Sequence, residues 1–328
     1  MKGKMFTLDS GLRGFWTAGK SHILPLFASV VLIVLGNLIS PGFAKLSNIA
    51  NILTMSSILI IAAIAQLLVV VTGEEGIDLS IGAVMSMGCL LMPTYSRGDN
   101  LRFIPVCIAL LVIAAVIGLI NGLSTQYLKL PPLVMTMIMG IVVNGATFAI
   151  VHGQPSVTVP GLLLAVSKPV LGPVRVLLLI ALLFAAIFVL FLKKTRLGRS
   201  LFLIGCNRPA AELSGISVRR NVVLAYMMAS MLAMIAGMFM VGYVGTANIK
   251  MAEKYTMLSV ASLAVGGTKM FGGRGSITAS ALGAVVMVVL TNLLVAAGLN
   301  TGVQKICEGG ILQFVLILLF LNSPKLRQ

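Results

Sequence analysis

Long apolar stretches alternate with short polar ones along nearly the whole of this chain. Most of the apolar stretches are close to the ~20 residues that an α-helix needs to cross the hydrocarbon core of a membrane. Ten candidate spans follow one another, at 23–40, 50–72, 77–95, 103–123, 132–151, 174–192, 221–243, 255–267, 276–297 and 303–322. The pattern therefore predicts an all-α fold, a polytopic transmembrane helical bundle of about ten spans.

The candidate span at 255–267 is too short to cross a membrane as one straight helix. It is rich in small residues and ends in Gly266-Gly267. Because lipid offers no hydrogen-bond partner to irregular backbone, we expect a broken helix that packs inside the bundle. In another span Gly118 and Gly122 form a GxxxG pattern, a spacing that favours close packing of two helices.

A polar island at 193–220 separates the sixth candidate span from the seventh and contains seven of the chain's 24 Lys and Arg residues. Basic loops stay on the cytoplasmic side of a membrane, so we expect the island to lie there. Ten crossings would place both termini on the same side. Sixteen Lys and Arg residues then face the cytoplasm and eight face outward, which supports a cytoplasmic N-terminal tail (1–22) followed by a single transmembrane domain (23–328).

The middle of the polar island predicts a short helix. Asn207 suits an N-cap, Pro209 suits the first turn, and Gly215 suits a stop. Helical spacing then places three side chains on one face: Ala210, Leu213 and Ser214. A small, lightly apolar helix below the membrane suits docking onto a soluble partner, and the alternative is a plain connecting loop that only fixes topology.

The composition is that of a membrane protein: mean hydropathy is +1.08, 59% of the residues are hydrophobic and only 10% are charged. In a soluble chain, a net charge of +16 and a pI near 10.2 would suggest binding to nucleic acid. Here the basic residues cluster in loops between spans and only eight acidic residues are present, so orientation in the membrane explains the excess. We therefore expect no nucleic-acid partner.

The sequence predicts no catalytic residue and no metal site. The four cysteines have no CxxC spacing, and the two histidines, His22 and His152, give no metal-binding motif. Residues 14–21 fit the phosphate-loop pattern GxxxxGK[ST], which works only between a buried strand and a helix. No apolar strand precedes this pattern, so ATP chemistry must come from another protein.

A polar segment at 74–82 interrupts two apolar spans. Asp78 could cap the helix that starts near Leu79 by accepting a hydrogen bond from a free N–H group such as that of Ser80. Alternatively, Asp78 and Ser80 could face the path of a hydroxylated solute, since acidic residues within spans are costly and often functional. The sequence leaves both interpretations open.

Other polar residues also lie within candidate spans. Glu308 follows Lys305 by three residues, so the two could form an ordinary helical pair, with proton coupling as the alternative. Four uncharged groups are Asn121, Thr136, Asn144 and Gln313. Hydrogen bonding between helices is the simplest role for each of them. Uncharged polar groups at membrane depth suit a neutral polyhydroxylated solute better than an ion or a strong anion.

Five segments resemble, in the same order, the motifs of one known family. They are GIDLSIGA at 76–83, GLINGLSTQYLKLPPLVMT at 118–136, HGQP at 152–155, IGCNRPAAELSGISVRR at 204–220 and VGGTKMFGGRGSITASALGA at 265–284. The chain is thereby similar to the membrane subunits of bacterial ABC uptake systems, in the ribose/xylose/galactose-type permease family. Branched-chain amino-acid permeases are related but lack the IDLS signature, which favours the sugar type. Glu74-Glu75 departs from the family pattern, which usually has small residues there.

The resemblance implies a permease domain in the bacterial cytoplasmic (inner) membrane that moves a sugar or a similar neutral polyhydroxylated solute by alternating access. It implies an ATP-binding cassette subunit that binds ATP and Mg, a periplasmic or lipid-anchored solute-binding protein, and a second permease subunit, identical or paralogous. This chain itself would hold no cofactor. The residues expected to couple the loop 193–220 to the ATPase are Gly205, Asn207, Ala210, Ala211, Leu213 and Gly215. The residues expected along the solute path are Asp78, Ser80, Asn121, Thr136 and Asn144.

Two other classes of function are alternatives. An ion-coupled secondary transporter would use Asp78 or Glu308 and would need no ATPase. A membrane enzyme would need a nucleophile–base pair or a metal cluster, and the sequence offers neither.

Overall fold

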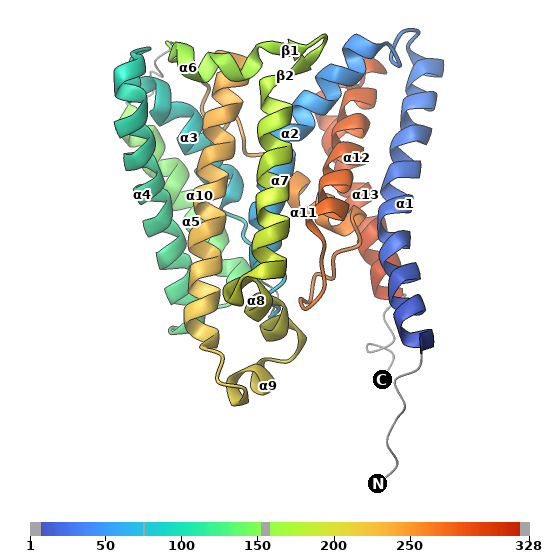
Figure 1. The fold of residues 1–328 in the computed structure, drawn as a ribbon. Helices are drawn as coiled ribbons and strands as arrows, with labels where there is room; N and C mark the ends of the chain where they lie inside the picture. Colours follow the sequence, from blue (N-terminus) through green and yellow to red (C-terminus); the bar gives the residue numbers. More distant parts are fainter. Residues whose placement is uncertain (1–7, 75, 152–157, 322–328) are drawn as a thin grey trace.

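The computed structural model describes residues 8–74, 76–151 and 158–321 and is a bundle of helices (Figure 1). Within these ranges the α-helices are α1 (Leu8–Ile39), α2 (Leu46–Val70), α3 (Ile81–Ser96), α4 (Asn100–Gln126), α5 (Pro132–Val151), α6 (Gly161–Leu164), α7 (Val176–Lys194), α8 (Arg196–Cys206), α9 (Arg208–Leu213), α10 (Val218–Val244), α11 (Tyr255–Val265), α12 (Ile277–Ala296) and α13 (Thr301–Leu321). A 3-10 turn, η1 (Ala165–Ser167), precedes an antiparallel hairpin of β1 (Pro169–Leu171) and β2 (Val174–Arg175). The predicted all-α, polytopic helical bundle is confirmed.

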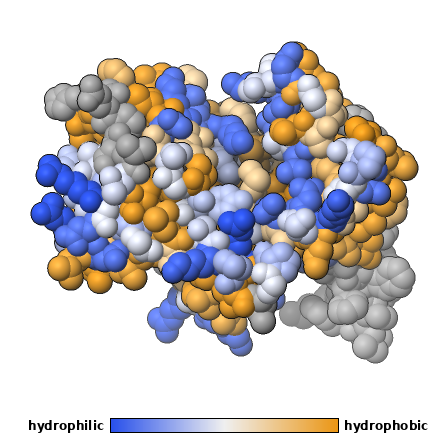
Figure 2. All heavy atoms as spheres, turned by 90° about the horizontal axis from the view of Figure 1, so that it is seen from above, coloured by the Kyte–Doolittle hydropathy of each residue, from blue (hydrophilic) through white to orange (hydrophobic). Residues whose placement is uncertain are grey.

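The loops distinguish the two ends of the bundle. We call the end at which α8 and α9 lie the α9 end, and the opposite end, where α6 and the β1–β2 hairpin lie, the hairpin end (Figure 1). The first turn of α1 and the last turn of α13 are also at the α9 end (Figure 1). Figure 2 looks onto the hairpin end, where hydrophilic residues gather on the face and hydrophobic residues line much of its rim.

Each of the ten predicted spans coincides with a helix, and seven helices of the described chain are long and apolar enough to cross a membrane. The predicted span at 77–95 is the shorter helix α3, because α2 ends at Val70 and α3 begins only at Ile81. The expected broken helix at 255–267 is α11, whose 11 residues end at Val265. A total of ten crossings stays a prediction.

The phosphate-loop pattern at 14–21 lies inside α1, so it is not the turn between a strand and a helix that phosphate binding requires. The predicted N-terminal tail is likewise helical from Leu8 onward. The backbone thus agrees with the expectation that this pattern does not bind nucleotide phosphate.

Helices α2 and α10 form the centre of the bundle. In α2, 89% of the most apolar stretch is buried, whereas in α4 the corresponding value is 22%. Ile104, Ile108 and Val112 of α4 face outward at a spacing of four residues, as expected for a helix with one face in lipid. Helix α10 packs against α2, α3 and α4, so it links the outer helices to the core.

The contact between α4 and α10 depends on the predicted GxxxG pair. A Cβ atom on Gly118 would collide with the carbonyl oxygen of Tyr226, and one on Gly122 would lie 2.7 Å from the Cα of Val223. The two glycines therefore let the backbones approach closely, as the spacing predicted.

Candidate functional site

The α2–α3 break, which we define as residues 71–80, contains the acidic segment that the sequence singled out. After α2 the backbone turns at Gly73, whose φ of +80° lies in the region that favours glycine. From Gly76 to Ser80 the break is buried or half-buried, and α3 begins after it. Non-helical backbone at this depth needs hydrogen-bond partners from the protein, since lipid supplies none.

Side chains of α2 and α5 supply those partners. Gln66 of α2 is fully buried, and with its amide oriented to satisfy both groups it donates to the Asp78 carbonyl oxygen and accepts from the Asp78 N–H, each at 3.0 Å. Thr136 of α5 accepts from the Leu79 N–H at 3.0 Å, and its hydroxyl lies 3.2 Å from the Ile77 carbonyl oxygen. The break is therefore tied to two neighbouring helices through its backbone.

The carboxylate of Asp78 is buried and bonded locally. Its Oδ1 accepts from the Ser80 N–H at 2.8 Å and from the Ser80 hydroxyl at 2.6 Å, and that hydroxyl accepts from Asn121 Nδ2 at 3.1 Å. Asp78 thus caps a free N–H group as predicted, although Ser80 is the N-cap residue of α3. Two oxygen atoms of this network, Asp78 Oδ2 and Asn121 Oδ1, have no hydrogen-bond partner in the described part of the chain.

Helix α10 carries two more such atoms, and one of them lies near Asp78. Tyr226 Oη and Ser230 Oγ lie one helical turn apart, and both are buried without a described hydrogen-bond partner. Tyr226 is close enough to Asp78 to interact with it electrostatically, and its hydroxyl also lies near the Thr125 hydroxyl, which donates to the Gly122 carbonyl oxygen at 3.1 Å. Leaving a buried polar atom unpaired costs about 1–3 kcal/mol. Such a gathering is typical of a site that water or a ligand fills.

These four atoms are all the buried, unpartnered side-chain N and O atoms of the described residues. We call the residues that meet around Asp78 the polar cluster: Asp78, Ser80, Asn121, Thr136 and Tyr226. Four of the five predicted path residues are therefore brought together. The fifth, Asn144, is half-buried two turns further along α5, and no described hydrogen bond joins it to the cluster.

A small cavity lies between the polar cluster and the α9 end. It is lined by Thr72, Gly73, Glu74, Gly76, Gln126, Pro132, Arg208, Val222 and Tyr226. The cavity has room for about one water molecule. A sugar does not fit there, so the cluster is closed toward the α9 end in this conformation.

Three other predictions concern residues away from the cluster. Glu308 accepts a hydrogen bond from Thr291 of α12 at 2.8 Å, and no ion pair joins it to Lys305 among the described residues, so the predicted helical pair is wrong. Thr291 lies across the helix interface and competes for the same carboxylate. The HGQP segment at 152–155 and Glu75 lie outside the described residues.

The predicted short helix of the polar island is α9. Asn207 caps it by accepting the Ala210 N–H at 3.1 Å, and Pro209 lies in its first turn. Gly215 ends it with a φ of +78°, after which the chain folds back. The three residues that predicted the helix are therefore the ones that begin and end it.

Helix α9 presents the predicted face to the outside of the bundle. Ala210, Leu213 and Ser214 are exposed, and Leu213 reaches 91% exposure, the highest value among the exposed large apolar side chains. Ala211, by contrast, is buried. An exposed leucine suits a partner surface with an apolar groove, and the exposed basic residues of the flanking segments, Arg199, Arg219 and Arg220, suit acidic groups there.

The polar island also contains a helix, α8, that was not predicted from the sequence. Gly198, Leu201 and Ile204 are buried along one face of α8, and Thr195 caps it by accepting the Gly198 N–H at 3.0 Å. The sequence does contain a helical pattern here, because small or apolar residues recur at intervals of three. The many basic residues of the segment suggested a loop instead, so the pattern was not recognised.

Three segments meet at what we call the glycine junction: Gly73, Gly205, Gly272 and Gly273. A Cβ atom on Gly205 would collide with the Val71 carbonyl oxygen and lie 2.5 Å from the Gly273 nitrogen. The Gly273 N–H donates to the Val71 carbonyl oxygen at 3.0 Å. The end of α8 is thus packed, backbone against backbone, on the start of the α2–α3 break.

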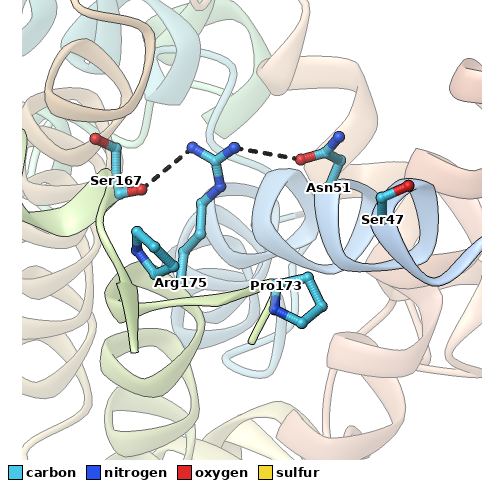
Figure 3. Close-up of a pocket in the computed structure, with 6 residues that line it drawn as sticks. Ser47, Asn51, Ser167, Pro173 and Arg175 are labelled. Carbon is cyan, nitrogen blue, oxygen red and sulfur yellow. Dashed lines mark hydrogen bonds between the residues drawn. The ribbon is translucent and has the colours of Figure 1, made fainter. Parts of the chain in front are cut away.

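A pocket lies at the hairpin end, between the start of α2 and the hairpin. Figure 3 shows Arg175 in it, with its guanidinium between the Ser167 carbonyl oxygen at 3.2 Å and Asn51 Oδ1 at 3.4 Å. Ser47, Pro169 and Pro173 complete the lining, and the volume is about 330 Å³. No pattern in the sequence indicated this pocket, because its residues come from separate segments and carry no motif.

Gln66, Tyr226 and Arg208 were also missed as members of the site. Gln66 gave a usable signal, since it is a lone amide in the middle of a long apolar span. Tyr226 gave none, because a tyrosine near the start of a span is ordinary. Arg208 was counted only as one of seven basic residues of the island.

The comparisons with known proteins point in one direction. Residues 48–321 match the family described as branched-chain amino acid transport system / permease component. The chain is 33% identical to the galactose/methyl galactoside import permease protein of Haemophilus influenzae over 86% of this chain and 90% of that protein. It is 31% identical to the protein of the same name from Escherichia coli K12 (88% and 92% covered) and 28% identical to the ribose import permease protein of that strain (92% and 95% covered). No solved structure matches this chain.

Proposed function

Because this chain belongs to the branched-chain amino acid transport system / permease component family, we propose that it is the membrane subunit of an ABC importer for a sugar or a similar neutral polyhydroxylated solute. The choice of solute rests on one observation: this chain is similar, over most of its length and of theirs, to permeases named for galactose and ribose. The IDLS sequence at 77–80 supports the same choice.

We propose that an ATP-binding cassette subunit docks at the α9 end, which then lies in the cytoplasm. Support comes from the exposed Leu213 and from the exposed basic residues around α9, which suit a groove with acidic groups. ATP and Mg would bind to that partner, and this chain would need no cofactor. The coupling residues would be those expected from the sequence, with Leu213 as the apolar anchor and Gly205 at the glycine junction.

We propose that the polar cluster forms part of the solute path when the bundle opens. Its unpartnered oxygen atoms could accept or donate hydrogen bonds to solute hydroxyl groups, and the groups are uncharged apart from Asp78. The expected path residues Asp78, Ser80, Asn121, Thr136 and Asn144 would then be joined by Tyr226 of α10. A solute-binding protein at the hairpin end and a second permease subunit would complete the importer in the bacterial cytoplasmic membrane.

The test is purification of the chain from native membranes with its partners, followed by reconstitution into proteoliposomes. Uptake of radiolabelled ribose and galactose would be measured with ATP on the cassette side and with the solute-bound binding protein on the other. The matched control is the same complex with a cassette subunit that cannot hydrolyse ATP. We expect uptake only with ATP hydrolysis and binding protein together.

Uptake driven by a proton or sodium gradient in the absence of nucleotide would contradict this proposal. The variants Asp78→Asn and Glu308→Gln then identify the coupling carboxylate. If a cassette subunit co-purifies but neither sugar is transported, the chain is still an ABC importer subunit, and ribose and galactose are not its solutes.

A further inference from the structure

Arg208 differs from the other basic residues of the polar island. The other six are exposed: Lys193, Lys194, Arg196, Arg199, Arg219 and Arg220. The side chain of Arg208 is only 21% exposed, and it points from α9 into the bundle. A long basic side chain normally keeps its charge in water, so its burial here calls for partners.

One partner is on α9 itself, where Glu212 Oε1 lies 3.9 Å from Arg208 Nε, and the others come from two other elements. Arg208 Nη1 forms an ion pair with Glu74 of the α2–α3 break, and Nη2 donates to Gln126 Oε1 at 2.5 Å. Gln126 is the last residue of α4 and is buried, whereas the Glu74 side chain is half exposed. An exposed ion pair alone contributes little, so the buried amide is what makes the contact specific.

The same three side chains close the cavity that leads to the polar cluster. Arg208, Glu74 and Gln126 line that cavity together with Tyr226, whose hydroxyl lacks a described partner. Glu74 has a φ of +51°, a left-handed conformation that is unfavourable for a residue with a side chain. Its backbone is therefore held in place by its surroundings, with its carboxylate against Arg208.

We propose that Arg208 is the positioning residue of a latch at the α9 end, which with Glu74 and Gln126 shuts the solute path below Tyr226 until α9 is moved. The inference rests on the proposed function, since it takes the docked ATPase as the source of that movement. Displacing α9 withdraws the guanidinium from Glu74 and Gln126 and leaves the cavity open to the cytoplasm.

The neighbouring contacts explain why α9 can move while its surroundings stay fixed. Helix α8 ends at the glycine junction, where backbones are packed in contact and leave little room for displacement. In α9 itself, Ala211 is the only buried residue. Arg208 is thus the main side-chain tie of a weakly held helix, placed directly after a rigid joint.

The test measures access to the cavity and needs no transport. Val222 lines the cavity and is buried, so a cysteine there reports its opening. The four native cysteines are replaced by serine, Val222→Cys is added, and a membrane-impermeant thiol reagent is applied to inside-out vesicles. We expect Arg208→Ala to raise the labelling rate about tenfold, since charge-assisted hydrogen bonds are the stronger ones. The matched control, Arg199→Ala of an exposed arginine on α8, should leave the rate unchanged.

A charge swap keeps the proposal falsifiable if Arg208→Ala folds poorly. In a Glu212→Gln background, which removes the carboxylate 3.9 Å from Arg208 Nε, Glu74→Arg with Arg208→Glu restores the ion pair, and the Gln126 amide can turn to donate to the new carboxylate. We expect the double variant to label at nearly the parental rate and each single variant to label fast. Equal labelling of Arg208→Ala and the parent, or fast labelling of the double variant, overturns the latch.

A second readout separates a latch from a static brace. In the reconstituted importer, Arg208→Ala should lower the amount of solute moved per ATP hydrolysed about tenfold while the cassette subunit stays bound. A brace would lower stability and leave that ratio unchanged, which contradicts the latch. If no cassette subunit binds the parent chain, the proposed function fails, whereas the labelling result still decides whether Arg208 closes the cavity.

Discussion

Arg208 and Arg175 lie at opposite ends of the bundle, each beside a space that its neighbours enclose. At the α9 end Arg208 is paired with Glu74 and Gln126, and the space behind it has room for about one water molecule. At the hairpin end Arg175 donates at 3.2 and 3.4 Å to uncharged oxygen atoms, lies 5.3 Å from the Tyr243 ring centroid, and borders a space of about 330 Å³. One arginine is held by a carboxylate and a buried amide, and the other borders a larger pocket.

The difference has a physical origin. Arg208 combines a short hydrogen bond to a buried amide with a carboxylate partner, whereas both hydrogen bonds of Arg175 are long, so the α9 end is held more firmly. The glycine junction adds direct backbone packing at that end, whereas a Cβ atom on Gly172 of the hairpin would touch nothing within 4 Å. The structure is therefore closed toward α9, whereas the hairpin end carries a pocket of about 330 Å³.

The largest expected effect comes from Gln66→Leu, which tests whether the inner part of the bundle depends on specific bonds. The change keeps the side-chain volume similar but leaves the Asp78 N–H and carbonyl oxygen without partners in a membrane interior. We expect a loss of about 2–6 kcal/mol of stability, measured as thermal unfolding in detergent. The control at the hairpin end is Gln304→Leu, because that amide is partly exposed and donates to the Leu299 carbonyl oxygen alone. Equal destabilisation by both changes would mean that the interior of the bundle depends on specific hydrogen bonds no more than the hairpin end does.

The next largest effect is the loss of stability when a glycine at each end is replaced by alanine. Gly205→Ala forces a methyl group into the Val71 carbonyl oxygen and should cost about 1–3 kcal/mol, as overpacking does in cores. Gly172→Ala meets only the strain of a φ of +57° and should cost about 1 kcal/mol. Unfolding temperatures of the two variants give the comparison, and a hairpin variant that is less stable than the junction variant refutes it.

A smaller effect concerns docking. Leu213→Asp places a charge on the exposed face of α9 and should weaken binding of the ATPase subunit about tenfold without unfolding the chain. Leu162→Asp is the matched change at the hairpin end, where the leucine is also exposed. Co-purification with the cassette subunit should fall for the first variant alone. Normal retention by Leu213→Asp would reject the docking role of α9.

Local patterns predicted much of this arrangement, because helices and their ends depend on nearby residues. Asn207, Pro209 and Gly215 form α9 through contacts within a few positions, and Gly118 with Gly122 set the α4–α10 contact by spacing alone. The start of α3 was placed too early, since apolar periodicity continues through the break.

Contacts between distant segments could not be predicted in the same way. Arg208 meets Glu74 across 134 positions and Gln126 across 82, and no local pattern ranks this arginine above the six other basic residues of the polar island. Asn121 and Thr136 were named as polar residues at depth, yet only the folded chain brings them to opposite sides of the same break. For Glu308, a local pattern predicted a pair with Lys305, but the carboxylate accepts a hydrogen bond from Thr291 of another helix instead.

The smallest expected effect belongs to Arg175→Ala, which tests the hairpin end directly. Its two hydrogen bonds are long and lead to neutral groups, so we expect a loss of about 0.5–1 kcal/mol in stability and less than about threefold in uptake rate. Arg175→Lys separates charge from shape, because lysine keeps the charge but cannot hold both oxygen atoms while lying over Tyr243. If lysine behaves like alanine, the planar contact matters, and if it behaves like arginine, the charge does. If Arg175→Ala lowered the uptake rate as much as Arg208→Ala does, both ends would depend on their arginines. The two ends would then not differ in the way their contacts indicate.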